Sequence, residues 1–160
     1  MDETSGGHSS AYQVFISYAR EDHEAASDIY QWLRAAGLEV WMDTKRLKPG
    51  QNWNFEINIA LQNSSFVVVI LSKNSVDKRG YAQREIRTAL EKAEEKLIDD
   101  VFIIPILLDE NVSVPHQLRS VQYISAQGPG YENSVVDSIN SQIEKLGGER
   151  KQTQEEKDVY

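Results

Sequence analysis

Polar side chains recur in this chain directly after apolar runs that are typical of buried strands. Ser17 and Arg20 follow the run that begins at Val14, and the planar guanidinium of Arg20 suits a phosphate group. The carboxyl ends of parallel strands meet at one edge of a sheet, and ligands of such sheets bind there. The sequence therefore predicts a ligand site at this edge. Its polar candidates are Ser17, Arg20, Asp43, Ser72, Asn74 and Glu85.

Five apolar runs are the predicted strands that position these side chains. They cover residues 14–17, 39–42, 66–71, 102–108 and, more weakly, 121–124. The third and fourth runs are almost continuously apolar, as expected of strands that are covered on both faces. Pro105 interrupts the fourth run. Because proline cannot donate to a central ladder, an irregularity is expected there.

Segments with helical period separate the strands. In the first of them Ala26, Ile29 and Leu33 share one face, and Gly37 is placed to end the helix just after its C-cap. Three further apolar stripes cover 53–61, 86–97 and 135–146. Alternating strands and helices predict an α/β fold with a parallel sheet and right-handed crossovers. We expect a doubly wound, flavodoxin-like three-layer sandwich with a five-stranded parallel sheet.

The turn after the first predicted strand excludes several nucleotide-binding folds. It has no glycine, whereas a dinucleotide-binding Rossmann domain and a P-loop both require a glycine-rich turn. A phosphoacceptor receiver domain requires an aspartate at the end of its third strand, where this chain has Leu71 followed by Ser72. Glu21 and Asp22 are acidic residues in the right place for a receiver, but they are interpreted as the cap of the next helix.

Composition restricts the partners further. A net charge of −8 over 160 residues argues against nucleic acid, although a local cationic pocket could still bind a small phosphorylated ligand. The chain has no cysteine, which excludes disulfides and thiol nucleophiles, and its three histidines lack metal-ligand spacing, so no metal site is predicted. No apolar run approaches the roughly 20 residues that span a bilayer. We expect a cytoplasmic protein without direct membrane insertion.

One domain over residues 11–147 accounts for all predicted strands and helices. Residues 1–10 are rich in glycine and serine and are expected to form a disordered leader. After the glycine pair 147–148 the chain is almost entirely charged or polar. Residues 148–160 are therefore expected to form a flexible polar tail.

Three motifs, in this order, resemble signature segments of the Toll/interleukin-1 receptor (TIR) domain. The segment 14–18, Val-Phe-Ile-Ser-Tyr, is similar to the first signature box, and 43–50, which ends in Leu-Lys-Pro-Gly, is similar to the long loop after the second strand. Ser72 followed by Tyr-Ala-Gln-Arg-Glu-Ile at 81–86 resembles the third-strand end and the aromatic-x-x-x-Glu helix of the family. The resemblance covers about 12–146.

The resemblance implies an enzyme. TIR domains divide into scaffolds and enzymes that cleave the nicotinamide–ribose bond of NAD⁺, and Glu85 falls on the glutamate that marks the enzymatic, bacterial-like branch. NAD⁺ would be the substrate and no cofactor is implied. The transition state resembles an oxocarbenium ion and nicotinamide leaves as a neutral molecule, so one carboxylate suffices. ADP-ribose and a cyclic variant are both open as products. The alternative is a non-catalytic TIR scaffold.

The resemblance also implies a substrate-binding set around Glu85. Arg20 is the candidate for the pyrophosphate, and Phe15, Trp41 and Tyr81 are candidate stacking surfaces for nicotinamide or adenine. Tyr81 stands where the family usually has tryptophan. Phe15 fits plain core packing equally well, and serine and asparagine after a strand are also ordinary turn formers. The whole predicted set is Phe15, Ser17, Arg20, Asp43, Ser72, Asn74 and Tyr81.

Self-association is the last expectation. In the family the loop after the second strand bridges to a neighbouring domain, so TIR–TIR contacts between copies, and with other TIR-containing proteins, are expected. The residues of this predicted assembly loop are Lys45, Leu47, Lys48, Pro49 and Gly50.

Overall fold

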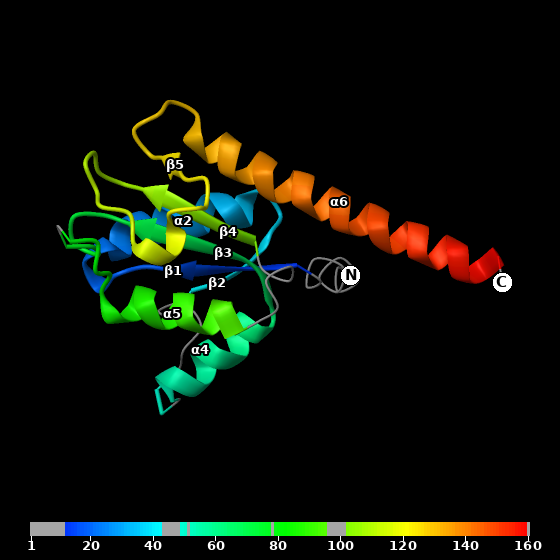
Figure 1. Cartoon of the computed structure of the whole chain (residues 1–160), viewed down its shortest axis with the longest axis horizontal. Helices are drawn as coiled ribbons and strands as arrows, with labels where there is room; N and C mark the ends of the chain where they lie inside the picture. Colours follow the sequence, from blue (N-terminus) through cyan, green and yellow to red (C-terminus); the bar gives the residue numbers. More distant parts are fainter. Residues whose placement is uncertain (1–11, 43–48, 51, 78, 96–101, 160) are drawn as a thin grey trace.

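A computed structural model describes residues 12–42, 49–50, 52–77, 79–95 and 102–159. Within these ranges five parallel strands form one sheet in the order β2-β1-β3-β4-β5 (Figure 1). The strands are β1 (Gln13–Ser17), β2 (Glu39–Trp41), β3 (Ser64–Leu71), β4 (Phe102–Leu107) and β5 (Ile124–Ser125). The helices are α2 (His23–Ala35), α4 (Trp53–Gln62), α5 (Arg84–Glu95) and α6 (Tyr131–Val159), with short 3-10 turns η1 (Arg20–Asp22) and η3 (His116–Leu118).

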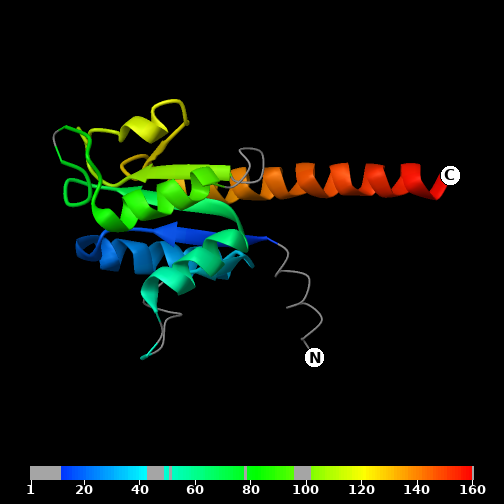
Figure 2. The same cartoon turned by 60° about the horizontal axis from the view of Figure 1, so that its bottom comes forward.

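The helices cover both faces of the sheet, and this makes the three layers that the sequence predicted (Figure 2). One core cluster joins α2 and α6 to side chains such as Val14 and Phe66, while the other joins α4 and α5 to their strand neighbours Phe15 and Val67. Neighbouring strand residues point to opposite faces, so both faces of β1 and β3 are buried. The predicted doubly wound fold is confirmed.

The end of α2 confirms the prediction that Gly37 lies just after the C-cap of this helix. Ala26, Ile29 and Leu33 are its buried residues, and the helix ends at Ala35. Gly37 follows the C-cap with φ of 89°, a left-handed conformation that side chains with a Cβ adopt only with strain.

The fifth strand differs from its predicted position at 121–124. The backbone N–H of Val121 donates to the carbonyl of Leu118 at 3.0 Å, which places Val121 in the turn after η3. Its apolar side chain packs against the core from that turn. β5 instead begins at Ile124, which pairs with Ile106 of β4.

Pro105 causes no shift in the pairing of β3 with β4, so the prediction of an irregularity at this residue is wrong. Leu108 donates its N–H to Leu71 of β3, whereas the carbonyl of Leu107 accepts from Ala126 on the β5 side, both at 2.8 Å. Residues two apart along a strand bond to the same side, so the missing N–H of Pro105 faces β5. Pairing with β5 begins only at Ile106, and no ladder bond is lost.

The last helix continues past residue 147, where a flexible tail was expected (Figure 1). Residues 149–157 are rich in Glu, Lys, Arg and Gln and contain no proline, a composition with high helix propensity. The glycine pair weakens such a helix without removing its hydrogen bonds. The domain boundaries themselves stay a prediction. Among the described residues, no helix is long and apolar enough to cross a membrane.

Candidate functional site

The carboxyl ends of β1 and β3 lie side by side, because Ser17 of β1 is in register with Val69 of β3. Ser17 is 3 % exposed and Ser72, just after β3, is 1 % exposed. No described residue forms a hydrogen bond with the Ser17 hydroxyl. A buried hydroxyl without a partner is costly, and such groups are enriched where ordered water or a ligand completes the structure.

Asp22 is the main polar anchor at this edge. It is 6 % exposed, and its Oδ2 accepts a hydrogen bond from the Ser72 hydroxyl at 2.5 Å while Oδ1 accepts from the Asn74 side-chain amide at 3.2 Å. Asp22 occupies the N-cap position of α2 as predicted, but its carboxylate makes no capping bond to that helix. Ser72 and Asn74 are thus brought together as predicted, by a residue that was assigned another role.

A second set of bonds connects this turn to the start of α5. The side-chain amide of Gln83 donates to the carbonyl of Asn74 at 2.5 Å, and the backbone N–H of Gln83 donates to the carbonyl of Ser75 at 2.8 Å. The carbonyl of Gln83 in turn accepts from Arg87 at 2.9 Å. Gln83 therefore holds the beginning of α5 against the end of β3.

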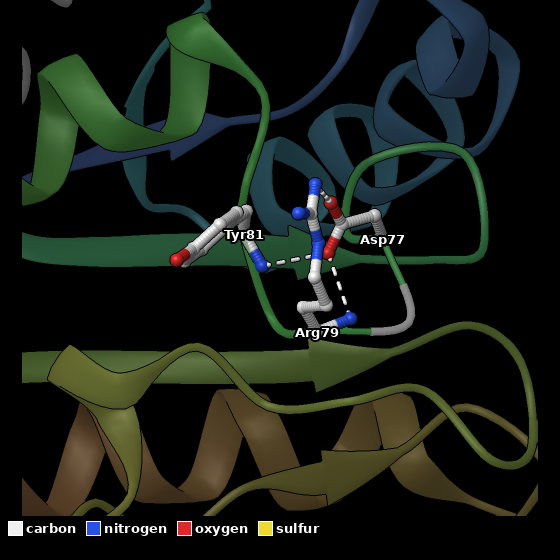
Figure 3. A network of polar contacts seen from close by, with 3 residues as sticks. All are labelled: Asp77, Arg79 and Tyr81. Carbon is white, nitrogen blue, oxygen red and sulfur yellow. Dashed lines mark hydrogen bonds and ion pairs between the residues drawn. The ribbon is translucent and has the colours of Figure 1, made fainter.

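Between Ser75 and Gln83 the chain makes a turn in which Asp77, Arg79 and Tyr81 contact one another (Figure 3). Asp77 Oδ1 accepts the backbone N–H groups of Arg79 at 2.8 Å and Tyr81 at 3.0 Å, and its Oδ2 pairs with the Arg79 guanidinium at 3.2 Å. The pKa of Asp77 is lowered, and the largest cause is the hydrogen bond from the backbone N–H of Tyr81. Partial desolvation raises the pKa, and smaller contributions from Arg79 lower it further. The Arg79 guanidinium also lies 4.9 Å from the centre of the Tyr81 ring.

Two of the three aromatic candidates, Phe15 and Tyr81, have very different surroundings. Phe15 is 2 % exposed, and its ring stacks on Trp41 of β2 at 5.0 Å between centroids and 10° between planes. This favours core packing over contact with a ligand, for Phe15 and for the covered face of Trp41. Tyr81 is 65 % exposed, with Arg79 near its ring. Of this pair, Tyr81 can offer its ring to a ligand.

Several predicted residues lie outside the described part of the structure. They are Asp43, Lys45, Leu47 and Lys48, together with the side chain of Glu85. The backbone of Glu85 belongs to the first turn of α5, directly after the segment that Gln83 holds. Arg20 begins η1, next to the edge, and its side chain is exposed, as are Pro49 and Gly50.

A cavity of about 290 Å³ lies elsewhere, in the connection between β4 and β5. Its lining residues are Val114, Leu118, Arg119, Ser120, Val121, Gln122 and Tyr123. None of them belongs to the predicted site. Within the described ranges no three His, Cys, Asp or Glu side chains lie close enough together to hold a metal ion.

A five-stranded parallel sheet of this order with helices on both faces defines a doubly wound α/β domain, and the family follows from comparison with known proteins. A family model described as TIR domain matches residues 14–139. The chain therefore belongs to the TIR-domain family. The TIR domain of a Toll-related receptor from Hydra magnipapillata superposes with a TM-score of 0.65 at 24 % identity, covering 81 % of this chain and 98 % of that one.

Bacterial relatives carry names of NAD⁺-processing enzymes. The "Probable 2' cyclic ADP-D-ribose synthase TcpB" of Brucella melitensis is 31 % identical over 128 residues, which cover 72 % of this chain and 51 % of the relative. The "NAD(+) hydrolase PdTIR" of Paracoccus denitrificans is 37 % identical over 76 residues, or 47 % of this chain and 25 % of the relative. This chain thus matches about half or less of the length of these relatives.

Proposed function

We propose that this chain cleaves the nicotinamide–ribose bond of NAD⁺, with Glu85 as the catalytic carboxylate. The observation that carries the proposal is the membership of the TIR family together with relatives that are named NAD⁺ hydrolases and cyclic ADP-ribose synthases. The position of Glu85 supports it, because the first turn of α5 follows a segment that is tied to the carboxyl ends of the strands.

In the proposed reaction the C1′–N bond breaks and its electron pair returns to the pyridinium nitrogen, so nicotinamide leaves neutral. Glu85 stabilises the positive charge that develops on the ribose. Water then attacks C1′ and loses a proton to give ADP-ribose, or a nucleophilic group of the same nucleotide attacks to give a cyclic product. NAD⁺ is the substrate and no cofactor takes part.

The exposed members of the predicted set are assigned to the substrate. Arg20 is suited to the pyrophosphate and Tyr81 to one of the rings, and Asn74 is assigned to the substrate with them. Asp43 stays in the proposed set on the sequence alone. Ser17 and Ser72 lie at the same edge but are buried, and their part is to shape its floor.

Activity is proposed to depend on contact between copies of the domain through the loop 43–50. Phe55 and Ile59 lie one turn apart on α4, shortly after this loop, and are 59 % and 39 % exposed. Two large apolar side chains at this place are consistent with a surface that another TIR domain covers. Nicotinamide release per molecule should then rise with protein concentration.

The test compares wild type with Glu85→Gln and, as a matched control, Glu91→Gln, which removes an exposed carboxylate from the same helix. NAD⁺ is supplied at high protein concentration with a crowding agent, and products are separated by chromatography. Glu85→Gln should lower nicotinamide release about 100-fold or more, whereas Glu91→Gln should not. Full turnover in Glu85→Gln would refute the assignment. No release by the wild type would favour the non-catalytic scaffold.

A further inference from the structure

Asp22 is a buried carboxylate that the proposed reaction does not use, and both of its oxygens bond to a segment about 50 residues away. We propose that Asp22 is a positioning residue, which fixes the start of α5, and with it Glu85, relative to the loop after β1. The proposal rests on the proposed function, since it names the residue that orients its catalytic group.

The first step runs from Asp22 into the turn after β3. The carboxylate accepts hydrogen bonds from the Ser72 hydroxyl and from the Asn74 side-chain amide, and hydrogen bonds to a charged acceptor are about twice as strong as neutral ones. With its proton committed to Asp22, the Ser72 oxygen accepts the backbone N–H groups of Asn74 and Ser75, both at 3.1 Å. One carboxylate thereby orients the donors and acceptors of the whole turn.

The second step runs from this turn to α5. Gln83 bonds to the carbonyls of both Asn74 and Ser75, so the turn and the residue that precedes α5 are fixed together. Gln83 is followed by Arg84, the first residue of α5, and then by Glu85. The backbone of Glu85 is two residues from the last bond of the network.

The third step connects Asp22 to the loop after β1, on the other side of the site. The N–H of Asp22 donates to the carbonyl of Ala19 at 2.8 Å and closes η1, which contains Arg20. The same residue therefore sets the positions of the proposed phosphate-binding segment and of the proposed catalytic helix. A carboxylate whose only task was to cap α2 would bond to the N–H groups of that helix, and Asp22 does not.

Asp22→Asn is the informative variant because it keeps the shape and removes the second acceptor. If its oxygen accepts the Asn74 amide, its NH₂ group meets the Ser72 oxygen, which already accepts two N–H groups, and the Ser72 proton loses its partner. A displacement of a catalytic group by about 1 Å is enough to reduce turnover substantially. We expect kcat for NAD⁺ to fall about tenfold with KM changed less than about twofold.

Two further variants separate positioning from a general effect. Glu21→Gln removes the neighbouring, exposed carboxylate and should leave kcat unchanged. Gln83→Met keeps the length of the side chain but removes the bond to Asn74, and should lower kcat like Asp22→Asn. Because both act through one network, the double variant should be no worse than the more severe single variant. The proposal would be overturned if the two substitutions multiplied their effects on kcat in the double variant. It would also be overturned if kcat fell only in proportion to the fraction of unfolded protein.

A second measurement does not depend on turnover. Backbone hydrogen exchange over residues 74–87 should be about tenfold faster in Asp22→Asn than in Glu21→Gln, because the turn and the start of α5 open more often. Unchanged exchange would refute the positioning role even if the wild type cleaved NAD⁺. If the wild type failed to cleave NAD⁺ while exchange rose as expected, the proposed function would fail and the structural connection would stand.

Discussion

Replacement of Phe15 and Tyr81 by leucine distinguishes an aromatic ring that builds the core from one that is free to meet a ligand. Phe15 is directly opposite Trp41 in the pairing of β1 with β2, so their stacking is a cross-strand pair on one face of the sheet. Tyr81 protrudes from a turn and contacts the Arg79 guanidinium. Both substitutions replace an aromatic ring by the same aliphatic side chain, in opposite environments.

The magnitudes follow from burial. For Phe15→Leu the lost aromatic pair contributes about 1 kcal/mol beyond its buried area, and the space left by the ring adds a cost of similar size. The free energy of unfolding should fall by about 2 kcal/mol, which lowers Tm by roughly 4–8 °C in a domain of this size. Tyr81→Leu removes an exposed cation–π contact and should cost only about 0.5 kcal/mol. Its effect belongs to binding, where loss of ring stacking should raise KM for NAD⁺ about tenfold.

The assay is urea unfolding of both variants and of wild type, followed by NAD⁺ kinetics at a temperature where all three are fully folded. We expect Phe15→Leu to change stability with KM unaffected, and Tyr81→Leu to do the reverse. A Phe15→Leu protein of wild-type stability with a raised KM would refute the reasoning, because it would show that the ring faces the substrate and not Trp41.

Three further outcomes are expected. Gly37→Ala should lower the free energy of unfolding by about 1 kcal/mol, because the positive φ is strained for alanine although its Cβ would meet no atom; wild-type stability in thermal unfolding would contradict this. Ser17→Ala should raise stability by about 1 kcal/mol, since it removes a buried hydroxyl without a partner among the described residues, and a loss of stability would indicate a hidden hydrogen bond. The pKa of Asp77 is lowered below 3.8. The stabilisation that its ionised carboxylate gives the Asp77–Tyr81 turn is therefore present above pH 3.8 and is lost as the pH falls through the lowered pKa. An acid titration of the Arg79 and Tyr81 amide signals should give a midpoint below 3.8, and a midpoint above it would contradict this.

The sheet could be predicted from the sequence because the buried strands are continuous apolar runs of suitable length. β3 and β4 were found in this way. The predicted position of β5 was wrong because Val121 is as apolar as a strand residue and yet packs against the core from a turn. Apolar character reports burial, and it does not report which backbone conformation achieves it.

The meeting of polar residues at one edge of the sheet was predictable, and the bonds between them only partly. The edge where Ser17 and Ser72 meet follows from parallel strands, which is a property of the fold class. The role of Asp22 could not be found, because an acidic residue just before a helix also has the pattern of a cap, and its partners become neighbours only when β1 and β3 pair. Phe15 is similar: strand alternation leaves its environment open, and only the register with Trp41 decides it.

The position of Pro105 has a consequence for how such domains meet one another. β5 covers only the last part of β4, and along the remaining flank the proline removes a donor that an added strand would need. This side of the sheet is therefore a poor template for a strand from another molecule. On this flank, copies that come together, as proposed above, would be restricted to contacts between loops and helices, which form and separate without any exchange of backbone hydrogen bonds.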